Sequence, residues 1–212
     1  MTLEEMVINN CKKNKSKKFV SNALLIALTL SLPKDVISGE MPNGASVQSG
    51  NINITNTSPD HMVIDQSTNK SIINWESFSI HNNGRVDFNM PNSSSSSLNR
   101  VTGSTPSNIA GQLNSNGRVM IINPNGVMIT KEGVVKTGSF TASTLDINNK
   151  DFLKDRLKFE GNGSSKSVRN KGKIIVGQGG NAALLGGQIS NSGTVTAKLG
   201  KISLGAGEKI TL

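Results

Sequence analysis

Short apolar runs alternate with clusters of asparagine, glycine and serine along most of the chain. In Asn51-Ile52-Asn53-Ile54-Thr55 the apolar residues occupy every second position, which places both isoleucines on one face of a strand. Val86, Phe88 and Met90 alternate in the same way, and Asn123-Pro124-Asn125-Gly126 follows another apolar run with a strong turn signal. This pattern of short strands separated by turns predicts an all-β fold.

One turn-strand-turn unit occurs twice. Asn83-Gly84-Arg85-Val86 returns as Asn116-Gly117-Arg118-Val119, and Pro91-Asn92 returns as Pro124-Asn125 at the same offset. We interpret the two stretches as copies of one structural unit, because a fixed offset between similar segments is typical of repeat architectures.

A shorter period dominates the C-terminal part. Asn170-Lys171-Gly172 returns as Asn191-Ser192-Gly193, Val168 returns as Ile189 at the same offset, and Leu185-Gly186 returns as Leu204-Gly205 at a slightly smaller one. Strands repeated about every 20 residues predict a parallel β-helix or solenoid, in which each coil stacks its apolar residues on the previous coil. A propeller blade would need about twice that length.

Four segments are interpreted separately from the repeat. Residues 44–54 are expected to form the cap that starts the coil, and 62–90 suit either hairpins or coil corners. Ser93–Ser97 is expected to be a tight loop within one domain. Asp146–Phe159 begins with helix-capping residues and continues with helical spacing, which predicts a short helix or an ordered loop outside the coil.

Residues 1–38 have the features of an export signal. Five lysines precede the apolar run Phe19–Leu32, which Pro33 ends and which is too short to span a bilayer as a helix. Cleavage is expected before Gly39, and an uncleaved anchor is the alternative. The remaining domain, 39–212, stops in mid-pattern at Leu212, so we expect further repeats after it or a truncated gene.

Composition narrows the function. Aromatic residues make up only 3% of the chain, and the one cysteine, Cys11, precedes the apolar run, so the mature chain would have no disulfide and no catalytic thiol. The formal charge of +9 falls to +6 after cleavage, because the leader holds six lysines and three acids. The arginines are dispersed and Trp75 is the only Trp, which disfavours nucleic-acid binding.

No catalytic or metal site is predicted. His61 and His81 have no partner at ligand spacing, and no serine lies in a G-x-S-x-G turn. The acids Asp60, Asp65, Glu76 and Asp87 are interpreted as solvated carboxylates. We therefore expect neither enzymatic activity nor a cofactor. A pectate-lyase-like enzyme would need a charged cluster along one groove, which the sequence does not display.

The segment Asn123-Pro124-Asn125-Gly126 suits a β-turn at every position. Proline fixes φ at the second position, asparagine tolerates the third, glycine accepts a positive φ, and the first asparagine side chain can bond the backbone across the turn. The sequence leaves two roles open: a corner that sets strand register, or a direct contact with a partner.

Five motifs in order resemble the N-terminal secretion domain of two-partner-secretion exoproteins, the filamentous-haemagglutinin and haemolysin-type family of Gram-negative bacteria. They are Ile73–Ile80, Leu98–Gly103, Gly111-Gln112-Leu113 with Asn116-Gly117, Ile122–Val127 and Ala142–Ile147. The chain departs from the family in Val127–Glu132, where relatives commonly have a more apolar, glycine-containing segment, and it lacks a separate Asn-Pro-Asn-Leu motif.

The resemblance implies a right-handed parallel β-helix with an N-terminal cap and short extra-helical elements. It also implies delivery to the periplasm by the Sec machinery, recognition by the periplasmic domains of an outer-membrane β-barrel transporter, and secretion or display at the cell surface. The matching motif residues are Asn123, Pro124, Asn125 and Gly126, with Asn99, Arg100, Asn116 and Gly117 as a secondary set. The alternative is a directly adhesive module that binds host glycans or proteins at the host-cell surface.

Overall fold

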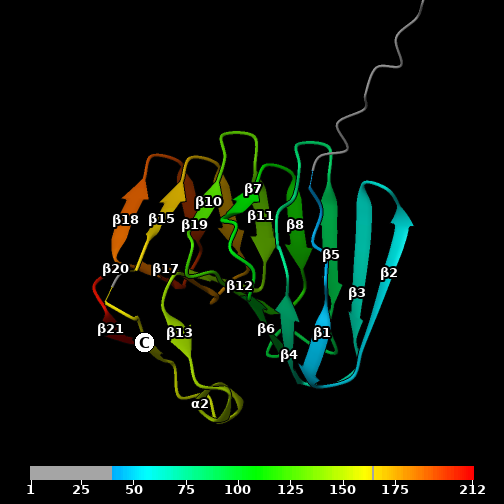
Figure 1. The fold of residues 1–212 in the computed structure, drawn as a ribbon, viewed down its shortest axis with the longest axis horizontal. Helices are drawn as coiled ribbons and strands as arrows, with labels where there is room; N and C mark the ends of the chain where they lie inside the picture. Colours follow the sequence, from blue (N-terminus) through cyan, green and yellow to red (C-terminus); the bar gives the residue numbers. More distant parts are fainter. Residues whose placement is uncertain (1–39, 164) are drawn as a thin grey trace, which may run out of the picture. The chain divides into compact units, whose positions relative to one another are not determined.

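The computed structural model describes residues 40–163 and 165–212. The predicted export signal and its cleavage position lie outside this part of the chain. Within it, three sheets of short strands face one another and enclose a narrow apolar interior (Figure 1). The predicted all-β parallel β-helix is confirmed.

The strands recur in a fixed order from sheet to sheet. The first sheet holds seven strands in the order β1 (Ser46–Ser49), β4 (Lys70–Trp75), β6 (Ser96–Val101), β9 (Arg118–Ile122), β12 (Ser139–Ser143), β17 (Asn181–Gly186) and β20 (Lys201–Ala206). The second sheet also holds seven, in the order β19 (Thr194–Ala197), β16 (Lys173–Val176), β11 (Val134–Thr137), β8 (Gln112–Ser115), β5 (Arg85–Asn89), β3 (His61–Gln66) and β2 (Ile52–Ser58). The third sheet holds four strands, β18 (Gln188–Asn191), β15 (Ser167–Asn170), β10 (Val127–Ile129) and β7 (Ser107–Ile109).

The cap is built from antiparallel strands. β1 pairs antiparallel with β4, and β2 forms a hairpin with β3, whereas β3 pairs parallel with β5. Both alternatives for residues 62–90 therefore occur, in different places. The stretch up to Gln66 belongs to a hairpin, and a coil corner follows it. Ile52 and Ile54 are half-buried while Asn53 and Thr55 are exposed, as their alternation predicts.

The stacking offset agrees with the shorter period of the sequence. Val168 lies opposite Ile189 in the third sheet, as that period predicts. Arg118 lies opposite Ser139 in the first sheet at the same spacing, so the shorter period extends beyond the C-terminal part in which it was found.

Two details of the predicted repeat are wrong. The stretches that begin at Asn83 and Asn116 are not equivalent units, because β5 belongs to the second sheet and β9 to the first. The predicted match of Leu185 with Leu204 is displaced by one position, since Leu184 pairs with Leu204 and Leu185 pairs with Gly205.

The serine run is only partly a loop. Ser96 and Ser97 begin β6 and are buried, and the Ser97 hydroxyl accepts a hydrogen bond from Ser71 Oγ at 3.0 Å. The prediction of a tight loop over all five serines is therefore wrong at its C-terminal end. Small hydroxyl residues fit here because they pair with one another inside the stack.

The segment predicted to leave the coil does so. It forms β13 (Asp146–Ile147), the helix α2 (Asn149–Leu153) and β14 (Lys158–Glu160), and β14 also pairs with β21 (Lys209–Thr211). Asn148 caps the helix, since its side chain accepts from Lys150 N at 2.9 Å. We call 146–160 the extra-helical segment; it lies beside the first sheet in Figure 1.

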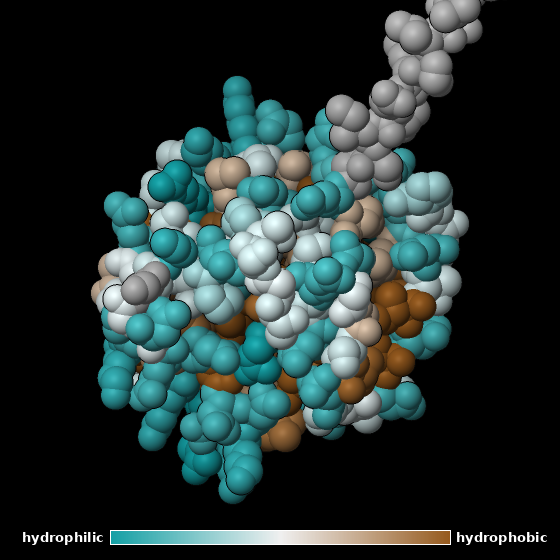
Figure 2. Space-filling model, in the orientation of Figure 1, coloured by the Kyte–Doolittle hydropathy of each residue, from teal (hydrophilic) through white to brown (hydrophobic). Residues whose placement is uncertain are grey.

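Two hydrophobic cores explain the apolar runs. Val119 and Ile121 point into the interior of the coil, whereas Met120 and Ile122 belong to a second core shared with Phe152 and Phe159 of the extra-helical segment. Because β9 is buried on both faces, its sequence is continuously apolar rather than alternating. Polar side chains cover most of the face shown in Figure 2, and hydrophobic ones gather on the side of β1 and β3, where Val47 of β1 is 44% exposed.

Candidate functional site

The turn Asn123–Gly126 joins β9 of the first sheet to β10 of the third. Gly126 N donates to Asn123 O at 3.0 Å, and Asn125 N donates to Asn123 Oδ1 at 2.9 Å. Gly126 has a φ of 120°, a value that side chains disfavour. The predicted turn geometry, including the bond from the first asparagine side chain across the turn, is confirmed.

The two asparagine side chains point back to the preceding coil. Asn123 Nδ2 donates to Thr105 O at 2.9 Å and to Ser107 Oγ at 3.0 Å, and Asn125 Nδ2 donates to Gly103 O at 2.9 Å. Asn123 is fully buried, and both protons of its amide nitrogen are used in these bonds. In the folded state Asn123 therefore links two coils, and its buried side chain cannot contact a partner protein.

Of the secondary set, Asn99 occupies the interior. Its Oδ1 accepts from the indole Nε1 of Trp75 at 3.0 Å, and its Nδ2 donates to Met120 O at 3.3 Å. Asn99 therefore connects β4, β6 and β9 through one buried amide. A buried amide must find hydrogen-bond partners within the protein. Asparagine fits this position because its side chain both accepts from Trp75 and donates to Met120.

The neighbouring Arg100 holds the extra-helical segment. Its Nε donates to Asp146 Oδ1 at 2.9 Å, and one terminal nitrogen donates to Ile147 O at 2.8 Å. The Arg100 side chain is 15% exposed and the Asp146 side chain 52% exposed, so the ion pair is only partly shielded from water. Sequence inspection gave no indication of this contact, because the partners lie far downstream in the chain.

Asn116 and Gly117 form a third link between coils. Asn116 donates to Met90 O at 2.7 Å and accepts from Met90 N at 2.8 Å. At Gly117 a side chain would lie 2.8 Å from Ser95 O, and the Gly117 carbonyl accepts from Gly138 N at 2.8 Å. The structure places these residues, Asn99 and the Asn123–Gly126 turn in separate places in the coil, so they form a series of links and not one cluster.

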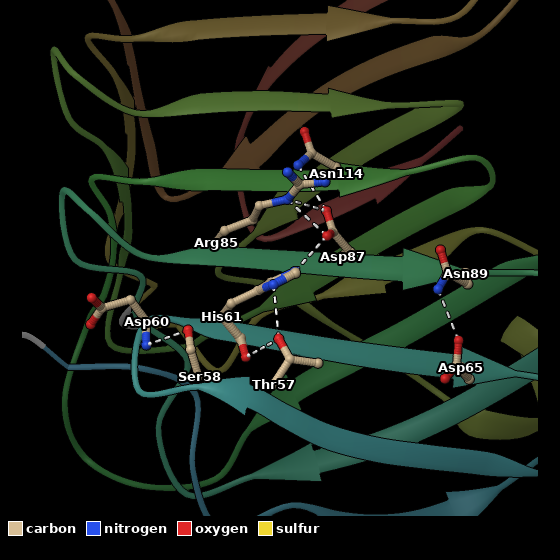
Figure 3. Close-up of polar contacts among 9 residues, drawn as sticks. All are labelled: Thr57, Ser58, Asp60, His61, Asp65, Arg85, Asp87, Asn89 and Asn114. Carbon is tan, nitrogen blue, oxygen red and sulfur yellow. Dashed lines mark hydrogen bonds and ion pairs between the residues drawn. The ribbon is translucent and has the colours of Figure 1, made fainter.

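A polar network on the second sheet was not predicted (Figure 3). Asp87 Oδ2 lies 2.7 Å from His61 Nε2, Arg85 Nε donates to both Asp87 oxygens at 2.9 and 2.8 Å, and Asn114 Nδ2 donates to Oδ1 at 2.9 Å. His61 Nδ1 lies 2.9 Å from Thr57 Oγ1. The network spans β2, β3, β5 and β8 and ties the cap hairpin to the first coils.

Asp87 is therefore not the solvated carboxylate that we expected. Burial opposes its ionisation, but the hydrogen bonds from Arg85, Asn114 and His61 together with the charge of Arg85 outweigh burial, and the pKa of Asp87 lies below its ordinary value. The spacing Arg85-x-Asp87 was the available signal, because residues two apart share a strand face. Their partners on other strands required knowledge of the stacking register.

Among residues 40–163 and 165–212, no three histidines, cysteines or carboxylates come together as metal ligands. No helix in the same part of the chain is long and apolar enough to cross a bilayer. The motif residues form hydrogen bonds that connect the backbone and the buried polar groups of successive coils.

Comparison with known proteins agrees with this architecture. The family described as TPS secretion domain matches residues 38–212. The crystal structure of the HMW1 secretion domain from Haemophilus influenzae superimposes with a TM-score of 0.76 at 38% identity, covering 80% of this chain and 46% of that one. A filamentous hemagglutinin secretion domain, at 18% identity and a TM-score of 0.50, covers 81% of this chain and 64% of that chain and shows the shared fold.

Two curated relatives from Haemophilus influenzae carry the name heme/hemopexin-binding protein. One is 34% identical over 176 residues, covering 83% of this chain and 18% of its own length. The other is 31% identical over 157 residues, covering 74% and 16%. This chain thus spans less than a fifth of either relative. With the family match over 38–212, these findings show that the chain belongs to the two-partner-secretion (TPS) secretion domains, a family of exoprotein N-terminal domains exported across the Gram-negative outer membrane.

Proposed function

We propose that this domain directs export of the exoprotein that carries it. The Sec machinery delivers the chain to the periplasm, the periplasmic domains of a cognate two-partner-secretion transporter recognise it, and the domain then folds outside the cell. The observation that supports this proposal is the pattern of asparagine links, in which Asn99, Asn116 and the Asn123–Gly126 turn bond to the coil before them. Each of these links can form only when the preceding coil is in place, because a repeat in a solenoid contacts only its neighbours.

The Asn123–Gly126 motif acts at two different moments. Before folding, its side chains are free and a partner can read them in an extended segment, for example by strand addition to a transporter sheet edge. After folding, Asn123 is buried and bonded to Thr105 and Ser107. Recognition therefore precedes folding, and burial of the motif releases the chain from the transporter.

The two ends of the stack support a role for this domain in nucleating the folding of later coils. Within residues 40–163 and 165–212, the antiparallel cap of β1 and the β2–β3 hairpin covers one end, whereas β18, β19 and β20 each have a neighbouring strand on one side only. Coils can therefore be added in one direction. Each added coil buries apolar strands, which draws the chain outward without ATP.

The experiment is a secretion assay in cells that express the cognate transporter. Asn123→Ala and Asn125→Ala are compared with Asn108→Ala, a surface asparagine of β7 whose side chain makes no hydrogen bond to the described residues. We expect both motif variants to accumulate in the periplasm and the control to be secreted normally. Immunoblots of culture medium and periplasm, normalised to total synthesis, measure the effect.

A binding measurement separates recognition from folding. Urea-unfolded wild type and Asn123→Ala are presented to the isolated periplasmic domains of the transporter, and refolding of each chain is followed separately. Weaker binding by the variant supports recognition of the motif. Normal secretion of both motif variants would remove the motif from the mechanism, whereas impaired refolding with unchanged binding would reduce its role to a structural corner.

A further inference from the structure

A groove lies between the first sheet and the extra-helical segment. It encloses about 400 Å³, and its floor is the outward face of β6, β9, β12, β17 and β20. Phe152, Asp155 and Leu157 form one wall. The outward side chains of the first sheet are apolar where the extra-helical segment covers them. Along the groove, the outward face of the same sheet carries a line of polar side chains.

Each of the five strands contributes a polar side chain to one row across the floor, and Thr141 and Ser203 add two further hydroxyls beside that row. Ser96 lies opposite Arg118, Arg118 opposite Ser139, and Asn181 opposite Lys201, while Asn181 N donates to Ser139 Oγ at 3.0 Å. We call these five residues the polar row. Because adjacent strands are about 4.8 Å apart, the row runs along the stack, with Arg118 and Lys201 three strands, or about 14 Å, apart.

The polar row carries two positive charges, on Arg118 and Lys201. Arg118 and Lys201 have no ion-pair partner among residues 40–163 and 165–212. The acid in the wall, Asp155, is already paired with Lys70 at 2.7 Å. A ligand with negative groups spaced along its length therefore complements the groove.

The floor also limits what kind of chain can bind. Extended peptides are recognised mainly through backbone hydrogen bonds at a sheet edge. Here the strands β6, β9, β12 and β17 each pair with a neighbour on both sides, so the floor offers hydroxyl, amide and cationic side chains instead of backbone groups. A hydroxyl-rich ligand matches this surface better than a peptide does.

We propose that the polar row binds an acidic linear oligosaccharide, which lies along the stack with acidic groups at Arg118 and Lys201 and sugar hydroxyls at Ser139 and Asn181. The repeat of one side chain per strand suits a polymer that advances by about one sugar residue per strand. This inference is independent of the proposed role in export, since it concerns the folded domain.

The test uses the purified folded chain and a hexamer of galacturonic acid, with binding followed by isothermal titration calorimetry. Neutral maltohexaose and hexaglutamate are the comparison ligands. We expect the acidic hexasaccharide to bind, maltohexaose not to bind, and hexaglutamate to bind at least tenfold more weakly. Rising salt should weaken the binding, because the contacts are exposed to solvent.

The variants locate the site. Arg118→Gln and Lys201→Gln should each weaken binding about tenfold, and the double variant should abolish it. Arg169→Gln, on β15 of the third sheet, removes an equivalent exposed charge and should change nothing. Circular dichroism verifies that each variant is folded. Unchanged binding by the double variant, equal binding of hexaglutamate, or no binding of the hexasaccharide at millimolar concentration each overturns the proposal.

Discussion

The indole Nε1 of Trp75 donates a 3.0 Å hydrogen bond to Oδ1 of Asn99 in the next coil, and both side chains are buried. This contact joins two successive coils in the interior, where neither atom has access to water. A polar pair in this position contributes little when it is complete and costs much when one partner is removed. The pair therefore selects one stacking register, because any other register would leave a buried polar atom without its partner.

Asn99→Ala should lower the free energy of unfolding by about 2–4 kcal/mol, because it leaves the Trp75 indole N–H unpaired and opens a cavity. Urea denaturation followed by far-UV circular dichroism measures the loss, since this signal does not depend on Trp75. Asn108→Ala is the control, and its effect should stay within about 0.5 kcal/mol. In a Trp75→Phe background the cost of Asn99→Ala should shrink, because the N–H is absent. Equal costs in both backgrounds would contradict the assignment.

Asp87 should make stability depend on pH. Its pKa is lowered in the folded state, so ionised Asp87 stabilises the fold above its unfolded pKa, and this contribution is lost as pH falls through the lowered folded-state value. Asp87→Asn should therefore cost about 1–2 kcal/mol at pH 7, and the difference from wild type should narrow below about pH 4. Urea unfolding at pH 7 and pH 3 tests this.

The control for this pH effect is Asp155→Asn, because the Asp155 side chain is 68% exposed and forms a single ion pair with Lys70. Its cost should be small at both pH values. If Asp87→Asn and wild type differ by the same amount at pH 7 and pH 3, the ionised form of Asp87 is not what the network stabilises.

Glycine at coil corners is required by close packing at some positions and not at others. A side chain at Gly180 would lie 1.9 Å from the carbonyl oxygen of Gly138, which belongs to the backbone of the preceding coil, whereas at Gly177 the nearest atom would be 3.6 Å away. Gly180→Ala should therefore cost about 1–3 kcal/mol, and Gly177→Ala should cost much less. Thermal unfolding of the two variants compares them, and equal melting temperatures would contradict this explanation.

The sequence predicted the repeat, the cap, the capped helix and the geometry of the Asn123–Gly126 turn, because each depends on neighbouring residues. It did not predict which strands stack. The longer of the two offsets compared strands of different sheets, since similar turns precede strands on every face of a coil. Register also depends on inserted segments, as Phe140 pairs with Ala182 although the extra-helical segment lies between them in the chain.

In the candidate site, too, local features could be predicted from the sequence and contacts between coils could not. The turn sequence predicted a structural role for Asn123. Its bonds to Thr105 and Ser107 could not be predicted, because they depend on how the preceding coil stacks against it. The Asp87 network and the groove are assembled from one or two residues per strand, spaced by the coil length. Such surfaces become visible only when the stacking register is known.

Arg100 should control how firmly the extra-helical segment is held. Arg100→Gln removes the bonds to Asp146 and Ile147, while the second hydrophobic core around Phe152 and Phe159 remains. We expect tryptic cleavage after Lys150, Lys154 or Arg156 to accelerate severalfold, with a loss of global stability of about 1–2 kcal/mol, because local opening costs less than global unfolding. Arg169→Gln on β15 is the matched control and should leave the cleavage rate unchanged. Limited proteolysis with mass spectrometry identifies the sites, and unaltered cleavage in Arg100→Gln would show that the bonds of Arg100 do not hold the segment.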